Sequence, residues 1–296
     1  MAQPTFDWDQ ELRVRGFGNA ASVEPEYSHS QSGRVALIFT LTSTPDLILV
    51  LAAAFGAGLV DSMVGGGGLI QLPALFGVYP NTSPPLLLGT SKFAGIFGTA
   101  SAVARFASKV VIPWRALLPL AIGVLVASAL GAFIATQVAP AIFRPLMPMM
   151  LMAVLVYLLR RKDLGANHVP RAFSGSHHLF GTLLIVAIGF YDGFFGPGTG
   201  SFLMFVFVRF YGYDFLNAAA SARVLNVATN GAALAYFSWH GYVLWQIAFG
   251  MAVCNVLGSL VGTRLALRGG SVFVRKIFIV VVSALILRTA WTALRG

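Results

Sequence analysis

Apolar stretches of nearly membrane-spanning length follow one another along the chain, separated by short polar connections. The eight long stretches cover residues 46–64, 86–107, 115–137, 142–160, 179–195, 214–238, 243–266 and 272–292. Each has about the 20 residues that a helix needs to cross the hydrocarbon core of a bilayer. Two shorter apolar pieces, residues 68–77 and 199–210, follow glycine clusters and can cross only about half of it. The pattern predicts an all-α integral membrane protein with glycine-broken helices.

The second half of the chain repeats the first half at a constant shift of 131 residues, without a gap. Residues 61–68 (DSMVGGGG) return as residues 192–199 (DGFFGPGT), so each copy breaks one apolar segment at the same place. We expect a first membrane repeat at residues 45–163 and a second membrane repeat at residues 179–296. A duplication of this kind in an apolar chain indicates a transporter whose site lies between the two copies.

Two polar regions lie outside the repeats. Residues 1–44 hold five of the ten acidic residues and have neither the basic start nor the continuous apolar core of a signal peptide. They predict a polar N-terminal tail or, alternatively, a peptide that folds along the membrane surface. Residues 164–178 follow the basic run Arg160-Arg161-Lys162 and predict a cytoplasmic linker between the repeats.

Composition agrees with a membrane protein and limits its chemistry. Hydrophobic residues make up 57% of the chain and charged residues 10%, whereas about a quarter of the residues of soluble domains are charged. The mean hydropathy is +0.79. The excess of 20 basic over 10 acidic residues is expected at the cytoplasmic membrane surface, so nucleic acid is not an expected partner. The single cysteine, Cys254, excludes an intrachain disulfide and metal sites built from several thiolates, and we expect no cofactor.

The charges of the connections between segments are exchanged between the two copies. After the second long segment, the first copy has Arg105, Lys109 and Arg115 where the second copy has Tyr236, His240 and Gln246. One connection later, the first copy has Arg144, and the second copy has Arg264, Arg268, Arg275 and Lys276. By the positive-inside rule, equivalent connections lie on opposite sides of the membrane, so we expect two inverted-topology repeats. Each copy then crosses the membrane an odd number of times: the broken pair is a re-entrant hairpin before three spans, or both of its pieces cross fully.

The glycine clusters are the first part of the expected substrate site. Glycine and proline break a helix, and unwound backbone in a bilayer is tolerated only inside protein or along a wet cavity. The next helix begins with free N–H groups and the positive end of its dipole, which favour an anion. The candidate residues are Gly65, Gly66, Gly67 and Gly68 in the first copy and Gly196, Gly198, Thr199 and Gly200 in the second copy. We expect the two clusters to meet near the membrane midplane. The alternative role of these glycines is to let helices pack closely, which is the role that we expect for Gly131 and Gly262.

Polar and basic residues follow each break at the same distance. The candidates are Thr90, Ser91 and Lys92 in the first copy and Ser221, Arg223, Asn226 and Asn230 in the second copy. Lys92 and Arg223 occupy equivalent positions in apolar segments, where a charge costs about 2.5 to 3.5 kcal/mol unless it faces a cavity or a partner. Two such cations suit a small anionic substrate. The alternative, which does not exclude the first reading, is that each cation neutralises an aspartate of its own or of the opposite copy.

Asp61 and Asp192 lie about one helical turn before the two breaks. A buried carboxylate can carry a proton, so both residues are candidates for coupling anion movement to H+. Alternatively, each carboxylate accepts hydrogen bonds from the free N–H groups of its break.

The sequence GLVDSMVGGGGLIQLP at residues 58–73, with GTSK at residues 89–92, resembles the sulfite exporter TauE/SafE family of membrane transporters. The resemblance covers about residues 46–292. The second copy departs from the family pattern, because Arg223 stands where that family often has lysine and Met204 stands where the first copy has its proline.

The resemblance implies secondary transport of small sulfur-containing anions or organosulfonates, such as sulfite or sulfoacetate. It further implies export by alternating access, driven by an ion gradient, in the bacterial inner membrane. An anion channel and a membrane assembly protein without coupled transport are the alternatives. An intramembrane enzyme is not expected, because no serine of the apolar segments has an in-membrane histidine at helical spacing. The sequence leaves the carried anion and the oligomeric state open.

Overall fold

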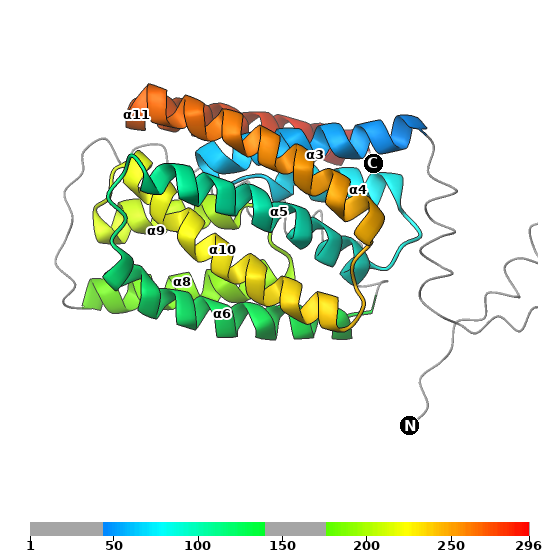
Figure 1. Cartoon of the computed structure of the whole chain (residues 1–296), viewed down its shortest axis with the longest axis horizontal. Coiled ribbons are helices and arrows are strands. Elements are labelled where there is room, and N and C mark those ends of the chain that lie inside the picture. The colour runs from blue at the N-terminus through cyan, green and yellow to red at the C-terminus, as the bar shows by residue number, and fades with distance from the viewer. Residues whose placement is uncertain (1–43, 140–175, 296) are drawn as a thin grey trace, which may run out of the picture. The chain divides into compact units, whose positions relative to one another are not determined.

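The computed structural model describes residues 44–139 and 176–295, which form helices joined by short connections (Figure 1). In chain order the helices are α3 (Thr44–Val64), α4 (Gly68–Val78), α5 (Pro84–Ala107), α6 (Trp114–Gln137), α8 (Ser176–Phe194), α9 (Thr199–Tyr211), α10 (Phe215–Trp239) and α11 (Trp245–Arg295). The described residues contain no β-strand, so the prediction of an all-α protein is confirmed for them. The expected tail, the apolar segment 142–160 and the linker lie, apart from residues at their ends, outside the described ranges.

Four of the described helices are long and apolar enough to cross a membrane: α3, α5, α6 and the part of α11 that ends at Gly270. The chain is therefore a multi-pass membrane protein. Fewer of the described helices reach spanning length and hydropathy than the apolar pattern predicts. α10 is long enough, with 25 residues, but Asn217, Asn226 and Asn230 make it more polar than these four. α4, α9 and the apolar part of α8 are shorter.

The helix boundaries repeat together with the sequence. α4, α5 and α6 begin at residues 68, 84 and 114, and α9, α10 and α11 begin 131 residues later in each case, at residues 199, 215 and 245. The local start signals differ between the copies. α5 begins with two prolines, whose fixed φ suits the first helical positions, whereas α10 begins after Asp214, whose carboxylate accepts a hydrogen bond from the Asn217 N–H (2.8 Å). α11 contains both of the last two expected segments and leaves helical geometry between them at Gly270 (φ 64°, ψ −170°).

In each copy, the helix before the glycine turn packs on a helix of the other copy. α3 of the first copy packs most extensively on α11 of the second, and the equivalent helix α8 packs on α6. A Cβ atom on Gly262 of α11 would lie 2.2 Å from the Leu59 carbonyl oxygen of α3, and one on Gly131 of α6 would lie 2.1 Å from the Phe190 carbonyl oxygen of α8. These distances leave no room for a side chain, so the close packing expected at both glycines is confirmed.

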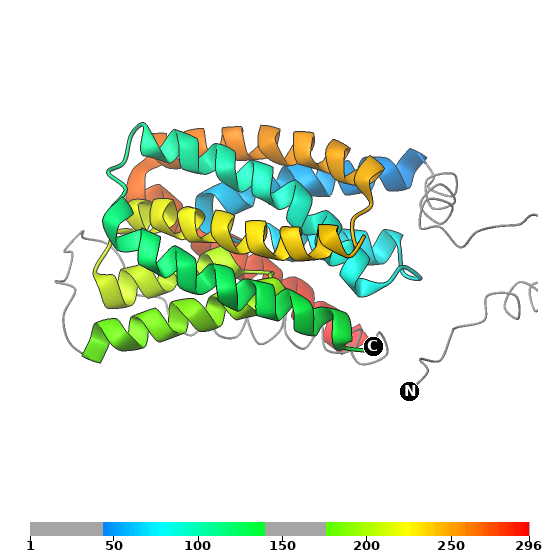
Figure 2. The same cartoon turned by 60° about the horizontal axis from the view of Figure 1, so that its bottom comes forward.

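α5 and α10, which are equivalent helices of the two copies, lie side by side and run in opposite directions (Figures 1 and 2). The start of α5 contacts the end of α10, because a Cβ atom on Gly89 would lie 2.9 Å from the Cβ atom of Phe237. Near the middle of both helices, the Ile96 side chain lies 3.6 Å from the Cβ position of Gly231. α10 is thus antiparallel to α5, its equivalent in the first copy.

Each glycine-broken pair of helices folds back on itself. The hydroxyl groups of Thr182, near the start of α8, and Tyr211, at the end of α9, lie 3.1 Å apart, so α9 returns to the end at which α8 begins. α4 returns along α3 in the same way, and the two folded pairs lie toward opposite ends of the long helices (Figure 1). Their glycine turns meet where Ser201 donates its N–H to the Gly65 carbonyl oxygen (3.0 Å) and its hydroxyl to the Val64 carbonyl oxygen (2.7 Å). The predicted meeting of the two glycine clusters is confirmed.

Gly65→Ala is expected to lower the melting temperature and the folded yield of the purified protein. Gly65 has a φ of 82°, and a Cβ atom there would lie 2.2 Å from the carbonyl carbon of Gly200. The left-handed conformation alone costs a non-glycine residue about 1 to 2 kcal/mol, and overlap with backbone adds to this cost. Gly77→Ala in α4 is the matched control, because its Cβ position is open, and it should be neutral or stabilise the protein by up to about 1 kcal/mol. Equal melting temperatures for the two variants would contradict the tight contact of the turns.

Candidate functional site

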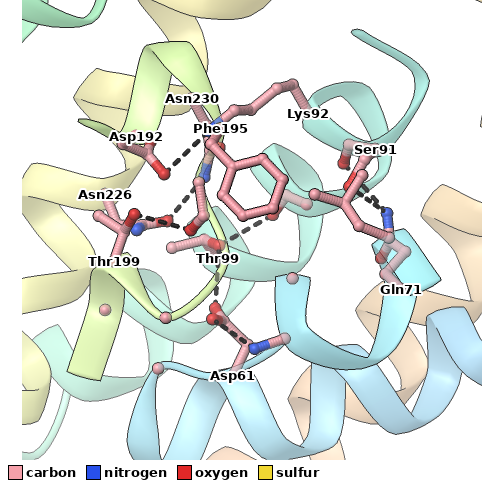
Figure 3. A pocket seen from close by; sticks show the side chains of 18 of the residues that line it. Asp61, Gln71, Ser91, Lys92, Thr99, Asp192, Phe195, Thr199, Asn226 and Asn230 are labelled. Atoms are coloured by element: carbon pink, nitrogen blue, oxygen red, sulfur yellow. Dashed lines mark hydrogen bonds and ion pairs between the residues drawn. The ribbon is translucent and has the colours of Figure 1, made fainter. Parts of the chain in front are cut away.

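A cavity of about 50 Å³ lies between the two glycine turns (Figure 3). One buried water molecule needs roughly 10 to 15 Å³, so the space holds a few water molecules or one small oxyanion. Both copies build its walls, with residues of α3, α4 and α5 from the first copy and residues of the second turn, α8, α9, α10 and α11 from the second copy. The cavity lies between the copies, where the repeat places the expected site.

The helices that follow the two glycine turns both begin at this cavity. Gly68 at the start of α4 and Thr199 at the start of α9 line it. Gly198, with a φ of 83°, leads the chain into α9, and the Thr199 hydroxyl donates a hydrogen bond to the Gly196 carbonyl oxygen (2.7 Å). The N-terminal end of a helix carries about half of a positive charge. Two such ends give the cavity a positive potential that suits an anion.

A buried ion pair joins the two copies at the cavity. The Lys92 ammonium of α5 lies 2.8 Å from Oδ1 of Asp192 of α8, and the two residues are 6% and 2% exposed (Figure 3). The Lys92 Nζ atom also lies 2.8 Å from the Cβ position of Gly196, which has a φ of 101°. Asp192 Oδ2 is buried and has no hydrogen-bond partner among the described residues. The lysine therefore pairs with the aspartate of the opposite copy, and one oxygen of that carboxylate is left open to a proton or a donor.

The equivalent residues Arg223 and Asp61 make different contacts. The buried Arg223 guanidinium donates to two backbone carbonyl oxygens, of Asp61 and of Ala219 (3.2 Å to Ala219). The Asp61 carboxylate accepts hydrogen bonds from the Gly67 N–H and from the Thr99 hydroxyl, at 3.3 Å each. Asp61 thus binds a free N–H group of its own glycine turn, as in the alternative role considered for both aspartates. Arg223 holds the backbone behind that turn.

Amide and hydroxyl side chains fill the rest of the polar wall. Gln71 donates a hydrogen bond to the Ser91 hydroxyl (3.1 Å) and accepts one from Asn255 (3.0 Å). Asn230 donates to the Asn226 side chain (2.6 Å). Gln71 and Asn255 were not predicted from the sequence. The signal that could have found them is that each is a polar residue in an apolar segment where the other copy has an apolar one, Phe202 and Val124 respectively.

The structure brings most of the predicted site residues together at this one cavity. The predicted residues that line it are Asp61, Gly65, Gly67, Gly68, Ser91, Lys92, Asp192, Gly196, Gly198, Thr199, Gly200, Asn226 and Asn230. Gly66, Thr90, Ser221 and Arg223 do not line it. The Thr90 hydroxyl accepts a hydrogen bond from the Leu244 N–H (2.9 Å) and donates one to the Leu86 carbonyl oxygen (2.7 Å), so it stabilises the connection to α11.

No metal-binding cluster of three or more histidine, cysteine or carboxylate side chains occurs within residues 44–139 and 176–295.

Comparisons with known proteins give one consistent result. The family model described as sulfite exporter TauE/SafE matches residues 50–289. The chain is 36% identical over 242 residues to a probable membrane transporter protein, ORF9, of a Sinorhizobium species, which covers 82% of this chain and 91% of that protein. It is 34% identical over 236 residues to a probable membrane transporter protein of Haemophilus influenzae (79% and 91% covered). It is also 34% identical over 225 residues to the probable membrane transporter protein YfcA of Escherichia coli (76% and 82% covered). No solved structure matches the chain.

The Lys92–Asp192 pair is expected to show strong coupling in a double-mutant cycle. Lys92→Gln or Asp192→Asn alone leaves one buried charge without its partner, which costs about 3 to 5 kcal/mol. The double variant removes both charges and should recover most of the stability that either single variant loses. Melting temperatures of the four proteins in detergent measure the coupling. Additive losses in the double variant would contradict a direct buried pair.

Proposed function

The chain belongs to the sulfite exporter TauE/SafE family of membrane transporters, and we propose that it exports small sulfur-containing oxyanions or organosulfonates, such as sulfite or sulfoacetate, across the bacterial inner membrane. One observation carries this proposal. The starts of α4 and α9 and the Lys92 ammonium converge on a cavity of about 50 Å³ that both copies share. A compact anion matches both the size and the sign of this site.

The charge of the cavity favours a dianion when Asp192 is protonated. The two helix starts together supply about one positive charge. The Arg223 guanidinium donates to the backbone carbonyl oxygen of Asp61, so Asp61 and Arg223 together add no net charge to this side of the cavity. Lys92 and an ionised Asp192 also cancel, which leaves about one positive charge in total. Protonation of Asp192 raises this total to about two and frees Lys92 for the substrate.

This coupling gives the export direction a driving force. A dianion that moves with one proton carries one net negative charge. A membrane potential that is negative inside drives such a charge outward by about 2.3 kcal/mol per 100 mV. An anion bound next to an ionised Asp192 would place two negative charges side by side in a buried site, and in this proposal the proton that moves with the anion removes their repulsion.

An inverted repeat supplies the mechanism of alternating access in this proposal. The antiparallel packing of α5 and α10 supports an axis in the membrane plane that relates the two copies. The folded pairs α3–α4 and α8–α9, which approach from opposite ends, support the interpretation of both as re-entrant hairpins. Because the halves have the same construction, rocking one against the other would open the same cavity alternately to either side.

Flux through the purified protein in liposomes tests the proposed function. The panel contains sulfite, sulfoacetate, other sulfonates and carboxylates of similar size. We expect saturable flux of sulfur anions that responds to an imposed membrane potential, with slower flux of the carboxylates. Non-saturable anion conductance would support the channel alternative instead, and absence of flux for every sulfur anion would contradict the proposal.

Lys92→Gln is expected to weaken anion binding, and more so for dianions. The lost Coulomb energy is proportional to the substrate charge, so a loss of about tenfold for a monoanion corresponds to about 100-fold for a dianion. Affinities measured by flux competition or calorimetry check this difference. Arg223→Gln removes a cation that does not line the cavity, and we expect lower stability with a smaller change in the ratio of dianion to monoanion affinity than in Lys92→Gln. An unchanged ratio in Lys92→Gln would contradict a direct role of the lysine.

Asp192→Asn is expected to abolish the response of anion flux to a pH gradient while leaving counterflow exchange of labelled anion measurable. The asparagine cannot take up the proton that accompanies the anion. Asp61→Asn is the matched variant, because its amide oxygen can still accept the hydrogen bond from the Gly67 N–H, and its flux should keep the pH response. A pH response that survives in Asp192→Asn and is lost in Asp61→Asn would assign proton coupling to the first copy instead.

A further inference from the structure

A second and larger hollow lies apart from the cavity, on the outer side of α3, α5 and α11. It has a volume of about 500 Å³ and is open. Its apolar lining consists of Phe55, Leu257, Leu260, Val261 and Leu265. Phe55, Leu257, Val261 and Leu265 are between 38% and 51% exposed, as expected for side chains that face lipid. We refer to this hollow as the outer groove.

Two arginines, Arg105 and Arg264, complete the lining of the outer groove. α5 and α11 run in the same direction here, since Gly98 contacts Asn255 and, one turn later, the hydroxyl groups of Ser101 and Ser259 lie 3.1 Å apart. The two arginines follow about one further turn along each helix. Neither arginine forms an ion pair within the described residues. A cation in an apolar wall needs an anionic partner or contact with water.

The other copy shows that the fold does not require cations at these positions. The residues equivalent to Arg105 and Arg264 are Tyr236 and Phe133, whose rings pack edge to face with their centroids 6.2 Å apart. The Tyr236 hydroxyl lies 3.3 Å from the Thr136 hydroxyl. In the other copy an aromatic contact therefore takes the place of the two cations. Helix packing therefore does not explain why two arginines occupy these positions.

The location of the two arginines fits the level of lipid headgroups. Arg105 lies in the last turn of α5, which ends at Ala107, and Arg264 lies before the break of α11 at Gly270. Both belong to the basic connections that the positive-inside rule places on the cytoplasmic side. Phosphate groups of phospholipids lie at this level of a bilayer. Basic pockets between membrane helices on this side are suited to anionic lipid headgroups.

We propose that the outer groove binds one anionic phospholipid, with its phosphate held between Arg105 and Arg264 and an acyl chain along the apolar wall. The charges of the groove and the lipid are complementary. Guanidinium groups form paired hydrogen bonds with phosphate oxygens, so two of them around one phosphate give a specific site. The lipid would contact α3 and α5 of the first copy and α11 of the second, and would therefore stabilise the contact between copies.

Native mass spectrometry of the purified full chain tests this site, with phosphatidylglycerol and phosphatidylcholine as probes. We expect phosphatidylglycerol to bind more tightly than phosphatidylcholine and to raise the melting temperature. Each of Arg105→Gln and Arg264→Gln should weaken binding of phosphatidylglycerol about fivefold, since each basic residue near the membrane surface contributes about that factor.

Two further variants make the test specific. The double variant Arg105→Tyr, Arg264→Phe installs the pair found in the other copy, so it should fold and lose the preference for phosphatidylglycerol. The double variant Lys109→Gln, Arg115→Gln removes the same charge from exposed positions of the same connection, and it should keep the preference. Equal preference in all variants would overturn the proposal. Absence of bound phosphatidylglycerol on the unmodified chain would also overturn it.

Discussion

The backbone contact between the two glycine turns is the constraint on which the rest of the structure depends. A turn inside an apolar protein leaves polar backbone groups unpaired, and each costs about 1 to 3 kcal/mol. The two turns satisfy each other, because Ser201 donates to the carbonyl oxygens of Gly65 and Val64. This contact admits no side chain at residue 65, and it holds the starts of α4 and α9 at one cavity. The positive potential of the cavity follows from this meeting of two helix starts.

Chemical differences between the two copies are concentrated around the two glycine turns and their cavity. Equivalent backbone positions carry Lys92 and Arg223, yet the lysine pairs with a carboxylate whereas the arginine donates to backbone carbonyl oxygens. Asn255 enters the cavity where the first copy has Val124, and a Cβ atom on Gly98 would overlap the Asn255 amide oxygen at 1.8 Å. Repetition thus provides two helix starts that face one another, and departures from repetition give the two sides of the cavity different chemistry.

The sequence was sufficient to predict where the described helices lie, the shift between copies and the meeting of the glycine clusters, although fewer of these helices than predicted are apolar enough to span a membrane. These features depend on local patterns and on a symmetry that is visible in the chain. It was not sufficient to predict which partner each charge takes. Lys92 and Arg223 occupy equivalent positions in the sequence. Only their contacts with other helices show that Lys92 lines the cavity, whereas Arg223 donates to a backbone carbonyl oxygen of α3. Thr90 belongs to the most recognisable motif, but its hydroxyl accepts a hydrogen bond from the Leu244 N–H, a contact 154 residues distant in the chain.

The difference between the two aspartates sets the number of coupled protons in the proposed mechanism. The Asp61 carboxylate accepts hydrogen bonds from the Gly67 N–H and from the Thr99 hydroxyl, so each of its oxygens has a partner within its own copy. One carboxylate oxygen of Asp192 forms the ion pair with Lys92, and the other has no hydrogen-bond partner among the described residues. A lysine has a flexible stem and can turn from the carboxylate to an arriving anion, which leaves Asp192 buried without a counter-charge. In the proposed mechanism the coupled proton binds at the free oxygen of Asp192 and none binds at Asp61, so one proton moves with the anion in each cycle.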